Sequence, residues 1–176
     1  SRGSKLAIRQ TQQVMEVLVA VHPQIEIEIQ VIRTQGDLQL DKPIEDLGGK
    51  SAFTTEIESA LLNREIDLAV HSLKDLPTNL PDELLYLGSP EREDARDVLI
   101  SKDDSTIEDI PENGIIATGS VRRKAQILSQ RPDIQIENLR GNVDTRLKKL
   151  DENKWNGIIT AAAAMHRLNL KNRISQ

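Results

Sequence analysis

The chain has 176 residues, which is enough for one large domain or two small ones. Hydrophobic residues make up 38% and charged residues 29%, and no apolar run approaches the length of a membrane span. The net charge of −5 and the aromatic content of 2% argue against a nucleic-acid surface, which needs cations for phosphates and rings for bases. We therefore expect neither a nucleic-acid partner nor a membrane partner.

The absence of cysteine excludes disulfides, thiolate metal sites and thiol catalysis within these residues. The three histidines, His22, His71 and His166, show no metal-ligand spacing, so we expect no metal site. No signal-peptide pattern stands at the start, which favours a cytoplasmic protein, or a plastid one if the source is a plant or alga. The chain starts without Met and ends directly after a helical pattern, so we expect a fragment of a longer protein.

The first half alternates helical and strand patterns, which predicts an α/β fold with a largely parallel sheet. Ser4 has the position of a helix cap, and Ile25, Ile27, Ile29 and Val31 alternate with polar residues. We predict a helix from 4 to about 20 and another from 55 to about 63, which begins with a capping box. We predict strands over 25–31, 66–70 and 84–87, and a mobile loop over 37–50.

A polar segment, His71-Ser72-Leu73-Lys74-Asp75-Leu76-Pro77, directly follows the predicted strand over 66–70. In open α/β sheets, ligands bind beyond the carboxyl ends of strands, so Lys74 and Asp75 stand where a site is expected. Taken alone, the segment would be a solvated Lys-Asp turn.

The second half repeats one arrangement of buried strand, polar loop and helix. A charged stretch over 90–97 predicts a crossover between domains 1–92 and 93–176. The predicted elements are a strand from 97 to 101, a short helix capped by Ser105, strands at 115–117, 134–139 and 158–160, helices from 121 and 143, and a small-residue helical run at 161–164.

Arg122 and Arg123 stand in the first turn of a predicted helix that Ser120 caps. Cations are unfavourable there, because a helix N-terminus is already electropositive, and a bound anion would reverse that balance. The alternative is a pair of solvated arginines. We favour the anion, and we expect the loops of this half to present Thr118, Ser120, Arg140 and Arg167 at one sheet edge.

A cleft with one carboxylate, Asp75, among several guanidinium groups suits a small ligand that carries several carboxylates, because arginine binds carboxylate bidentately. Phosphate would suit the charge equally well. The sequence offers no Ser-His-Asp or Cys-His pair and no phosphate-binding P-loop.

Seven motifs, in order along essentially the whole chain, resemble porphobilinogen deaminase, also called hydroxymethylbilane synthase. They lie at 2–7 (RGSKLA), 48–50 (GGK), 69–77 (AVHSLKDLP), 91–97 (EREDARD), 119–123 (GSVRR), 139–147 (LRGNVDTRL) and 161–168 (AAAAMHRL). The resemblance implies an enzyme of tetrapyrrole (porphyrin and heme) biosynthesis, a transferase that joins four porphobilinogen molecules into hydroxymethylbilane and releases ammonia. It also implies a dipyrromethane cofactor, which the family holds by a thioether to a cysteine in a third domain.

The resemblance assigns roles by position. Asp75 matches the catalytic aspartate, which contacts pyrrole N–H groups and stabilises the cation formed on ammonia loss. The residues matching the cofactor site are Ser72, Lys74, Asp75, Thr118, Ser120, Arg122, Arg123, Arg140 and Arg146. Those matching the substrate site are Arg2, Ser4, Arg140, Arg146 and Arg167, and Lys50 matches a lysine near the cleft mouth.

The family likeness further implies two lobes with mixed, mostly parallel sheets, similar to the type II periplasmic-binding-protein fold, in a monomeric parent enzyme. The third domain and its cysteine are absent from this chain, so we expect these 176 residues alone not to turn over substrate. The alternative is a non-enzymatic two-lobed module that binds a small polycarboxylate. Asp75 discriminates between the two, because an anion receptor gains nothing from a carboxylate among its arginines.

Overall fold

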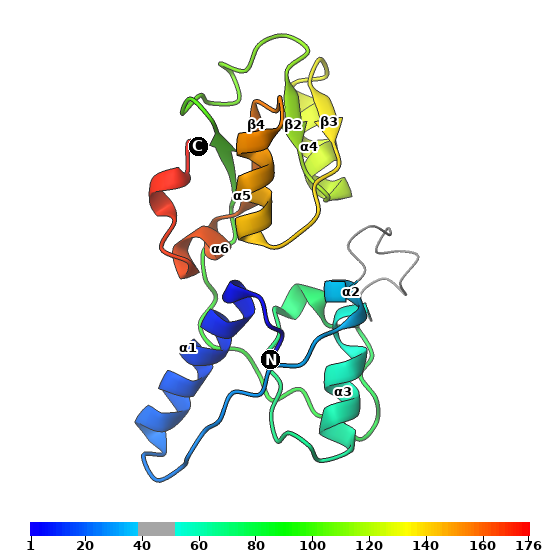
Figure 1. The fold of residues 1–176 in the computed structure, drawn as a ribbon, viewed down its shortest axis with the longest axis vertical. Helices are drawn as coiled ribbons and strands as arrows, with labels where there is room; N and C mark the ends of the chain where they lie inside the picture. Colours follow the sequence, from blue (N-terminus) through cyan, green and yellow to red (C-terminus); the bar gives the residue numbers. More distant parts are fainter. Residues whose placement is uncertain (39–51) are drawn as a thin grey trace. The chain divides into compact units, whose positions relative to one another are not determined.

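The computed structural model describes residues 1–38 and 52–176, which fall into two compact units, Ser1–Arg92 and Glu93–Gln176. Each unit is considered by itself. The helix labels below are those of Figure 1.

A four-stranded mixed sheet forms the centre of the second unit. Its strands are β1 (Asp97–Ser101), β2 (Ile115–Ala117), β3 (Gln135–Glu137) and β4 (Gly157–Ala161), in the order β1-β4-β2-β3. Strands β2, β3 and β4 are parallel, and β1 is antiparallel to β4. The α/β class and the mixed, mostly parallel sheet are therefore confirmed for this unit.

Helices cover both faces of this sheet. Alternate side chains of β1 and β4 point to opposite faces, as the pleat of a strand requires. On one face, Leu99 and Ile159 belong to an apolar cluster with Ile127 of α4 (Val121–Gln130). On the other face, Ile158 packs in a cluster with Leu150 of α5 (Val143–Glu152) and with residues of α6 (Ala162–Arg167). The single-turn helix η4 (Lys171–Arg173) follows α6.

The predicted helix after Ser105 is wrong, because a turn occupies its place. Thr106 donates from its backbone N–H and its hydroxyl to the Asp109 carboxylate, at 3.0 and 2.7 Å. The Arg131 guanidinium donates to the carbonyl oxygens of Ile107 and Ile110, at 2.8 and 3.0 Å. These contacts satisfy polar groups of the turn without a helix, and Pro111 has no N–H to offer the Ile107 carbonyl.

The first unit is helical wherever the structure describes regular elements in it. Its helices are α1 (Lys5–Val21), α2 (Gln35–Leu38), α3 (Thr55–Leu62) and the single-turn helix η3 (Leu73–Asp75). The predicted helices at 4–20 and 55–63 are confirmed, and Ser4 caps α1 by accepting the N–H of Ala7. The predicted capping box at Thr55 is wrong: Thr54 is the N-cap and makes no side-chain cap bond.

The strands predicted at 25–31, 66–70 and 84–87 are wrong, since none is assigned in the described part of the first unit. A strand requires a neighbouring strand for its backbone groups, and the pairing seen here among the described residues is short: Ile32 N–H donates to the Ser1 carbonyl at 2.8 Å, and the Ser1 amino group donates to the Gln30 carbonyl at 2.8 Å. Apolar side chains of these segments are exposed, with Leu68 at 41% and Leu85 at 81%. Asp37 and Leu38 belong to α2 rather than to the predicted loop, and the rest of that loop, over 39–50, lies outside the described residues.

Over 1–38 and 52–176, no helix is long and apolar enough to cross a membrane. The same residues contain no group of three His, Cys, Asp or Glu side chains that could hold a metal ion.

Candidate functional site

The carboxyl ends of the parallel strands β2, β3 and β4 meet at one edge of the sheet of the second unit. Thr118 and Ser120 follow β2 at this edge, and Arg140 follows β3. Strand β1 runs the other way and begins here, because Asp97 pairs with Ala161 at the end of β4. The edge therefore gathers the predicted hydroxyl and guanidinium groups together with a carboxylate that the sequence reasoning did not include.

Two glycines allow the loops at this edge to approach closely. A Cβ on Gly119 would lie 2.6 Å from the carbonyl oxygen of Leu139, so the loop after β2 touches the loop after β3. Gly141 has φ +116°, a conformation that side chains rarely adopt, and a Cβ there would meet Thr145 at 2.8 Å. Glycine is therefore required at one position by a close backbone contact and at the other by the backbone conformation.

The N-termini of α4 and α5 both lie at this edge and carry side-chain caps. Ser120 Oγ accepts the N–H of Arg123, and Thr118 Oγ1 accepts the N–H of Ser120 at 3.2 Å. Asn142 Oδ1 accepts the N–H of Thr145 at 2.9 Å. Helix N-termini favour anions, so the edge suits a ligand with carboxylate groups.

Asp97 pairs with both arginines of the first turn of α4. Its carboxylate accepts Arg122 Nη2 at 2.6 Å, and Arg123 Nε and Nη2 at 3.0 and 2.8 Å. The Asp97 carboxylate thus offsets the unfavourable interaction between these cations and the electropositive helix N-terminus. From the sequence, we had expected a bound anion in this role. Burial opposes ionisation of Asp97, but the bonds from Arg123 and Arg122 outweigh it and lower the pKa of this carboxyl group.

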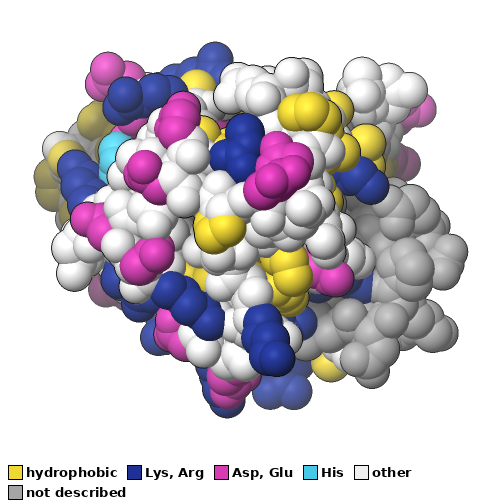
Figure 2. Space-filling view, turned by 90° about the horizontal axis from the view of Figure 1, so that it is seen from above, with side chains coloured by type: hydrophobic (Ala, Val, Ile, Leu, Met, Phe, Trp, Pro, Cys, Tyr) yellow, Lys and Arg dark blue, Asp and Glu magenta, His cyan; other side chains and the backbone are white. Residues whose placement is uncertain are grey.

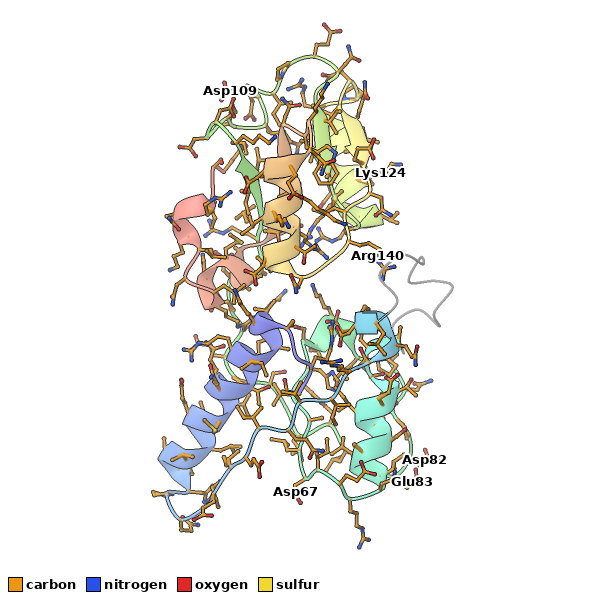
Figure 3. The ribbon with its side chains drawn as sticks, in the orientation of Figure 1. Asp67, Asp82, Glu83, Asp109, Lys124 and Arg140 are labelled. Atoms are coloured by element: carbon orange, nitrogen blue, oxygen red, sulfur yellow. The ribbon has the colours of Figure 1, made fainter. Side chains whose placement is uncertain are left out.

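The remaining predicted arginines of this unit lie at or near the same edge. Arg146 Nε donates to the Gly141 carbonyl at 2.7 Å, and Lys149 Nζ donates to the Arg140 carbonyl at 3.3 Å. Arg140 projects from the segment between β3 and α5 (Figure 3). Arg167 lies in the last turn of α6, next to His166, whose Nδ1 is 3.3 Å from Glu93.

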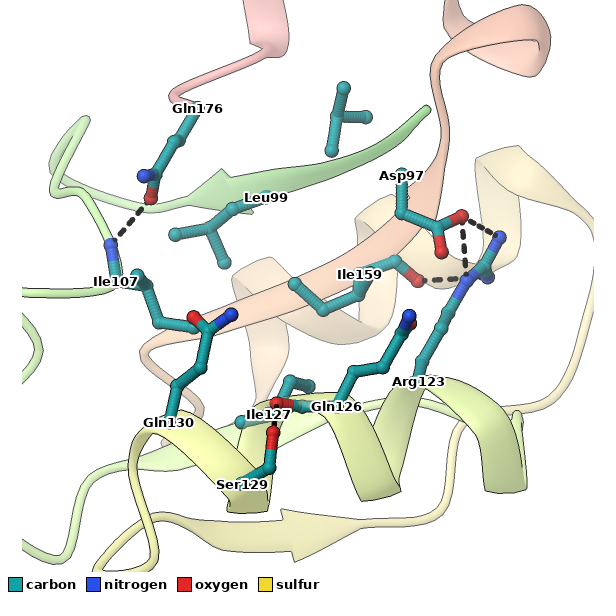
Figure 4. Close-up of a pocket in the computed structure, with 11 residues that line it drawn as sticks. Asp97, Leu99, Ile107, Arg123, Gln126, Ile127, Ser129, Gln130, Ile159 and Gln176 are labelled. Atoms are coloured by element: carbon teal, nitrogen blue, oxygen red, sulfur yellow. Dashed lines mark hydrogen bonds and ion pairs between the residues drawn. The ribbon is translucent and has the colours of Figure 1, made fainter. Parts of the chain in front are cut away.

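A groove of about 390 Å³ lies between α4 and the β1–β4 pair. Leu99, Ile127 and Ile159 give it an apolar lining, and the Asp97–Arg123 pair stands at one end (Figure 4). Of the predicted ligand residues, only Arg123 lines it. The groove therefore meets the polar sheet edge at Asp97 and Arg123 but is not lined by Thr118, Ser120 or Arg140.

In the first unit, Asp75 ends the single turn η3, and its N–H donates to the Ser72 carbonyl at 2.9 Å. Ser72 Oγ lies 3.1 Å from Gln10 Nε2 and from Gln10 Oε1, which ties this turn to α1. Asp75 is half-buried and Lys74 is exposed. Burial lowers the pKa of nearby His71, although the Asp75 carboxylate opposes this shift.

Arg2 is held by its own internal partners. Its Nε lies 3.2 Å from both carboxylate oxygens of Asp37, and its guanidinium stacks on Phe53, 4.4 Å from the ring centroid. Burial raises the pKa of Asp37, but the bonds from Arg2 and Thr34 more than offset this and lower it below its usual value. Sequence reasoning missed Asp37 as the partner of Arg2. The predicted cap at Ser4 is present, and its substrate role stays a prediction.

Asp75 is thus not the one carboxylate among the predicted arginines, because Asp37 and Asp97 are each bonded to them. Few features of the sequence indicate that these two carboxylates bind arginines: Asp97 ends the charged motif 91–97, and Asp37 follows a glycine. On the face shown in Figure 2, basic and acidic side chains lie interspersed. Lys50 lies outside the described residues.

Fold and site together define an α/β protein of two units, the second of which carries a sheet edge with arginines and two capped helix N-termini. The family described as "Porphobilinogen deaminase, dipyromethane cofactor binding domain" matches residues 1–176. The chain belongs to this family, which confirms the resemblance.

Three relatives illustrate the match, and each is called porphobilinogen deaminase. The protein of Brevibacillus brevis is 48% identical over 176 residues, which are 100% of this chain and 57% of that protein. The protein of Syntrophobacter fumaroxidans is 48% identical over 175 residues, or 99% and 57% of the two chains. The protein of Bacillus pumilus is 49% identical over 168 residues, or 96% and 54%. The chain thus spans little more than half the length of these relatives.

Proposed function

We propose that this chain supplies the cofactor- and substrate-binding residues of a porphobilinogen deaminase, which condenses four porphobilinogen molecules into hydroxymethylbilane with release of ammonia. The observation that carries the proposal is the family match over all 176 residues. The sheet edge of the second unit supports it, because guanidinium groups and two capped helix N-termini suit the acetate and propionate groups of pyrroles.

The donor set fits the dipyrromethane cofactor of the family. Thr118, Ser120, Arg122, Arg140 and Arg146 would hold its carboxylates by ion pairs and hydrogen bonds. The chain has no cysteine, so none of its own residues can form the thioether. When bound, the cofactor supplies the pyrrole on which the product chain is extended.

Asp75 is proposed as the catalytic residue. A carboxylate at this turn accepts pyrrole N–H groups and stabilises the positive charge that develops as ammonia leaves. We assign Ser72 and Lys74 of the same segment to ligand carboxylates. Because Ser72 bonds to Gln10, α1 fixes the position of this segment. Arg2, Ser4 and Arg167 remain the proposed substrate residues, with Arg2 held in place by Asp37 and Phe53.

We further propose that the units 1–92 and 93–176 are the two lobes of a type II periplasmic-binding-protein fold. Support comes from the mixed sheet of the second unit, with helices on both faces. The whole protein is proposed to act as a cytoplasmic monomer.

A chimera tests the activity. In the Brevibacillus brevis porphobilinogen deaminase, the matching 57% is replaced by this chain. We expect the chimera to convert porphobilinogen into hydroxymethylbilane, detected by its cyclisation to uroporphyrinogen in acid and oxidation of that product to uroporphyrin with added iodine, and the 176 residues alone to form none. A folded chimera that binds porphobilinogen without forming product would instead favour the non-enzymatic binding module.

A further inference from the structure

The two arginines that Asp97 binds differ in how firmly they are held. The Arg123 side chain is 11% exposed and donates twice to Asp97 Oδ1, and its Nη1 donates to the Ile159 carbonyl at 3.3 Å. The Arg122 side chain is 60% exposed. Its Nη2 donates to Asp97 Oδ2 at 2.6 Å, and its Nη1 donates to Gln126 at 2.8 Å.

We propose that Asp97 is a positioning and specificity residue, which fixes Arg123 permanently and competes with the ligand's carboxylate for Arg122. The inference rests on the proposed function, since it concerns how the same site receives a pyrrole carboxylate. Nothing in the family match distinguishes Arg122 from Arg123, whereas the structure gives them different surroundings.

Energetics support this division of roles. Arg123 is buried against strand β4, so releasing it would leave a desolvated guanidinium without its partners, which is costly. Arg122 makes an exposed ion pair, and such pairs contribute little to stability, so it can exchange partners easily. The mobile cation of the pair is therefore Arg122.

The competition also sets specificity. A neutral ligand group cannot replace the ion pair that Arg122 would lose, whereas a carboxylate can, and it can do so bidentately. The charge of Asp97 meanwhile repels a second carboxylate at the same guanidinium. Asp97 thus lowers the affinity of the site for every anion, but it selects ligands whose carboxylates can replace Asp97 as the ion-pair partner of Arg122.

The test is a titration of the 176-residue chain with porphobilinogen by calorimetry, using Asp97→Asn and a matched control, Asp104→Asn. Porphobilinogen serves as the probe because it carries the same acetate and propionate groups as the pyrroles of the cofactor that Arg122 is proposed to bind. Asp104 is an exposed residue of the same unit, with φ 62°, which asparagine tolerates. We expect Asp97→Asn to bind porphobilinogen about three- to tenfold more tightly, the size expected for removing one like charge near the ligand at a partly solvated surface. The control should change affinity less than about twofold, because its charge is solvated and screened.

A second pair of variants assigns the gain to Arg122. In an Arg122→Gln background, Asp97→Asn should give no tightening, whereas in a Lys124→Gln background the full gain should remain. Lys124 is exposed on the same helix (Figure 3). A merely structural role for Asp97 predicts the opposite sign, since loosening Arg123 would weaken binding.

Wild-type spectra supply a measurement that needs no variant to fold. In ¹⁵N NMR spectra, the Arg122 side-chain signal should shift on porphobilinogen addition, while the Arg123 Nε–H signal should stay in place. Unchanged or weaker binding by Asp97→Asn, or a stationary Arg122 signal, overturns the inference alone. A wild-type chain that does not bind porphobilinogen at all overturns the proposed function together with it.

Discussion

Gly119 holds the loops after β2 and β3 in contact, and Gly119→Ala tests whether that contact positions the site. The new Cβ would lie 2.6 Å from the Leu139 carbonyl oxygen, and the nearest ordinary contacts begin at about 3.4 Å. Backbone atoms cannot rotate away, so the loops must separate by several tenths of an ångström. Overpacking of this kind costs about 1–3 kcal/mol, and the loss of glycine's unfolded-state entropy returns about 0.4–1 kcal/mol. We expect a net destabilisation of about 1–2 kcal/mol.

Trp155 provides the assay, because it is the one tryptophan of the chain and packs against the core of the second unit. Urea unfolding followed by its fluorescence should show a lower midpoint for Gly119→Ala, with Lys124→Ala as the exposed control within about 0.5 kcal/mol of wild type. Porphobilinogen affinity should fall in parallel, since Ser120 and Arg140 flank the contact. An unfolding midpoint and an affinity that both equal the wild-type values would refute the reasoning.

Three further predictions concern parts of the fold that support the site. Leu150→Ala removes a fully buried side chain and should cost about 2–5 kcal/mol, again read from Trp155 fluorescence; a cost below about 1 kcal/mol would contradict the described core. Asp37→Asn should destabilise the first unit by about 1–2 kcal/mol and speed amide hydrogen exchange at residues 37 and 38, and unchanged exchange would count against the Arg2 anchor. Bonds from Arg131 lower the pKa of Asp133 from 3.8 to about 2, so the stabilisation it adds is complete above pH 4 and lost as the pH falls towards 2. Asp133→Asn should remove this component of the acid transition, and an identical acid profile would argue against the pair.

The second unit followed closely from its sequence because its signals are local. Short apolar runs marked β1, β2 and β4, the spacing of Ile134 and Ile136 marked β3, and Ser120 marked the start of α4 through its own cap bond. The direction of β1 could not be predicted from its own residues. An antiparallel strand begins where its parallel neighbours end, and this alone brings Asp97 beside Arg122 and Arg123.

The first unit shows the limit of periodicity. Alternation at 25–31 indicates which side chains would share one face of a strand, but it does not supply the neighbouring strand that pairing requires. Partners distant in sequence were missed for the same reason. The carbonyl groups that Arg131 binds lie 21 to 24 residues away, and Asp37 lies 35 residues from Arg2.

Turnover by the chimera is the sharpest test of the proposed catalytic role of Asp75. Asp75→Asn keeps the shape of the side chain and removes its charge, and Asp67→Asn makes the same change at an exposed residue of the same unit (Figure 3). We expect Asp75→Asn to lower kcat by about 100-fold or more, with KM within about threefold, because the carboxylate acts on the charge that develops during the reaction. We expect no change for Asp67→Asn. A chimera that turns over porphobilinogen at the wild-type rate with asparagine at position 75 would rule out a catalytic role for Asp75.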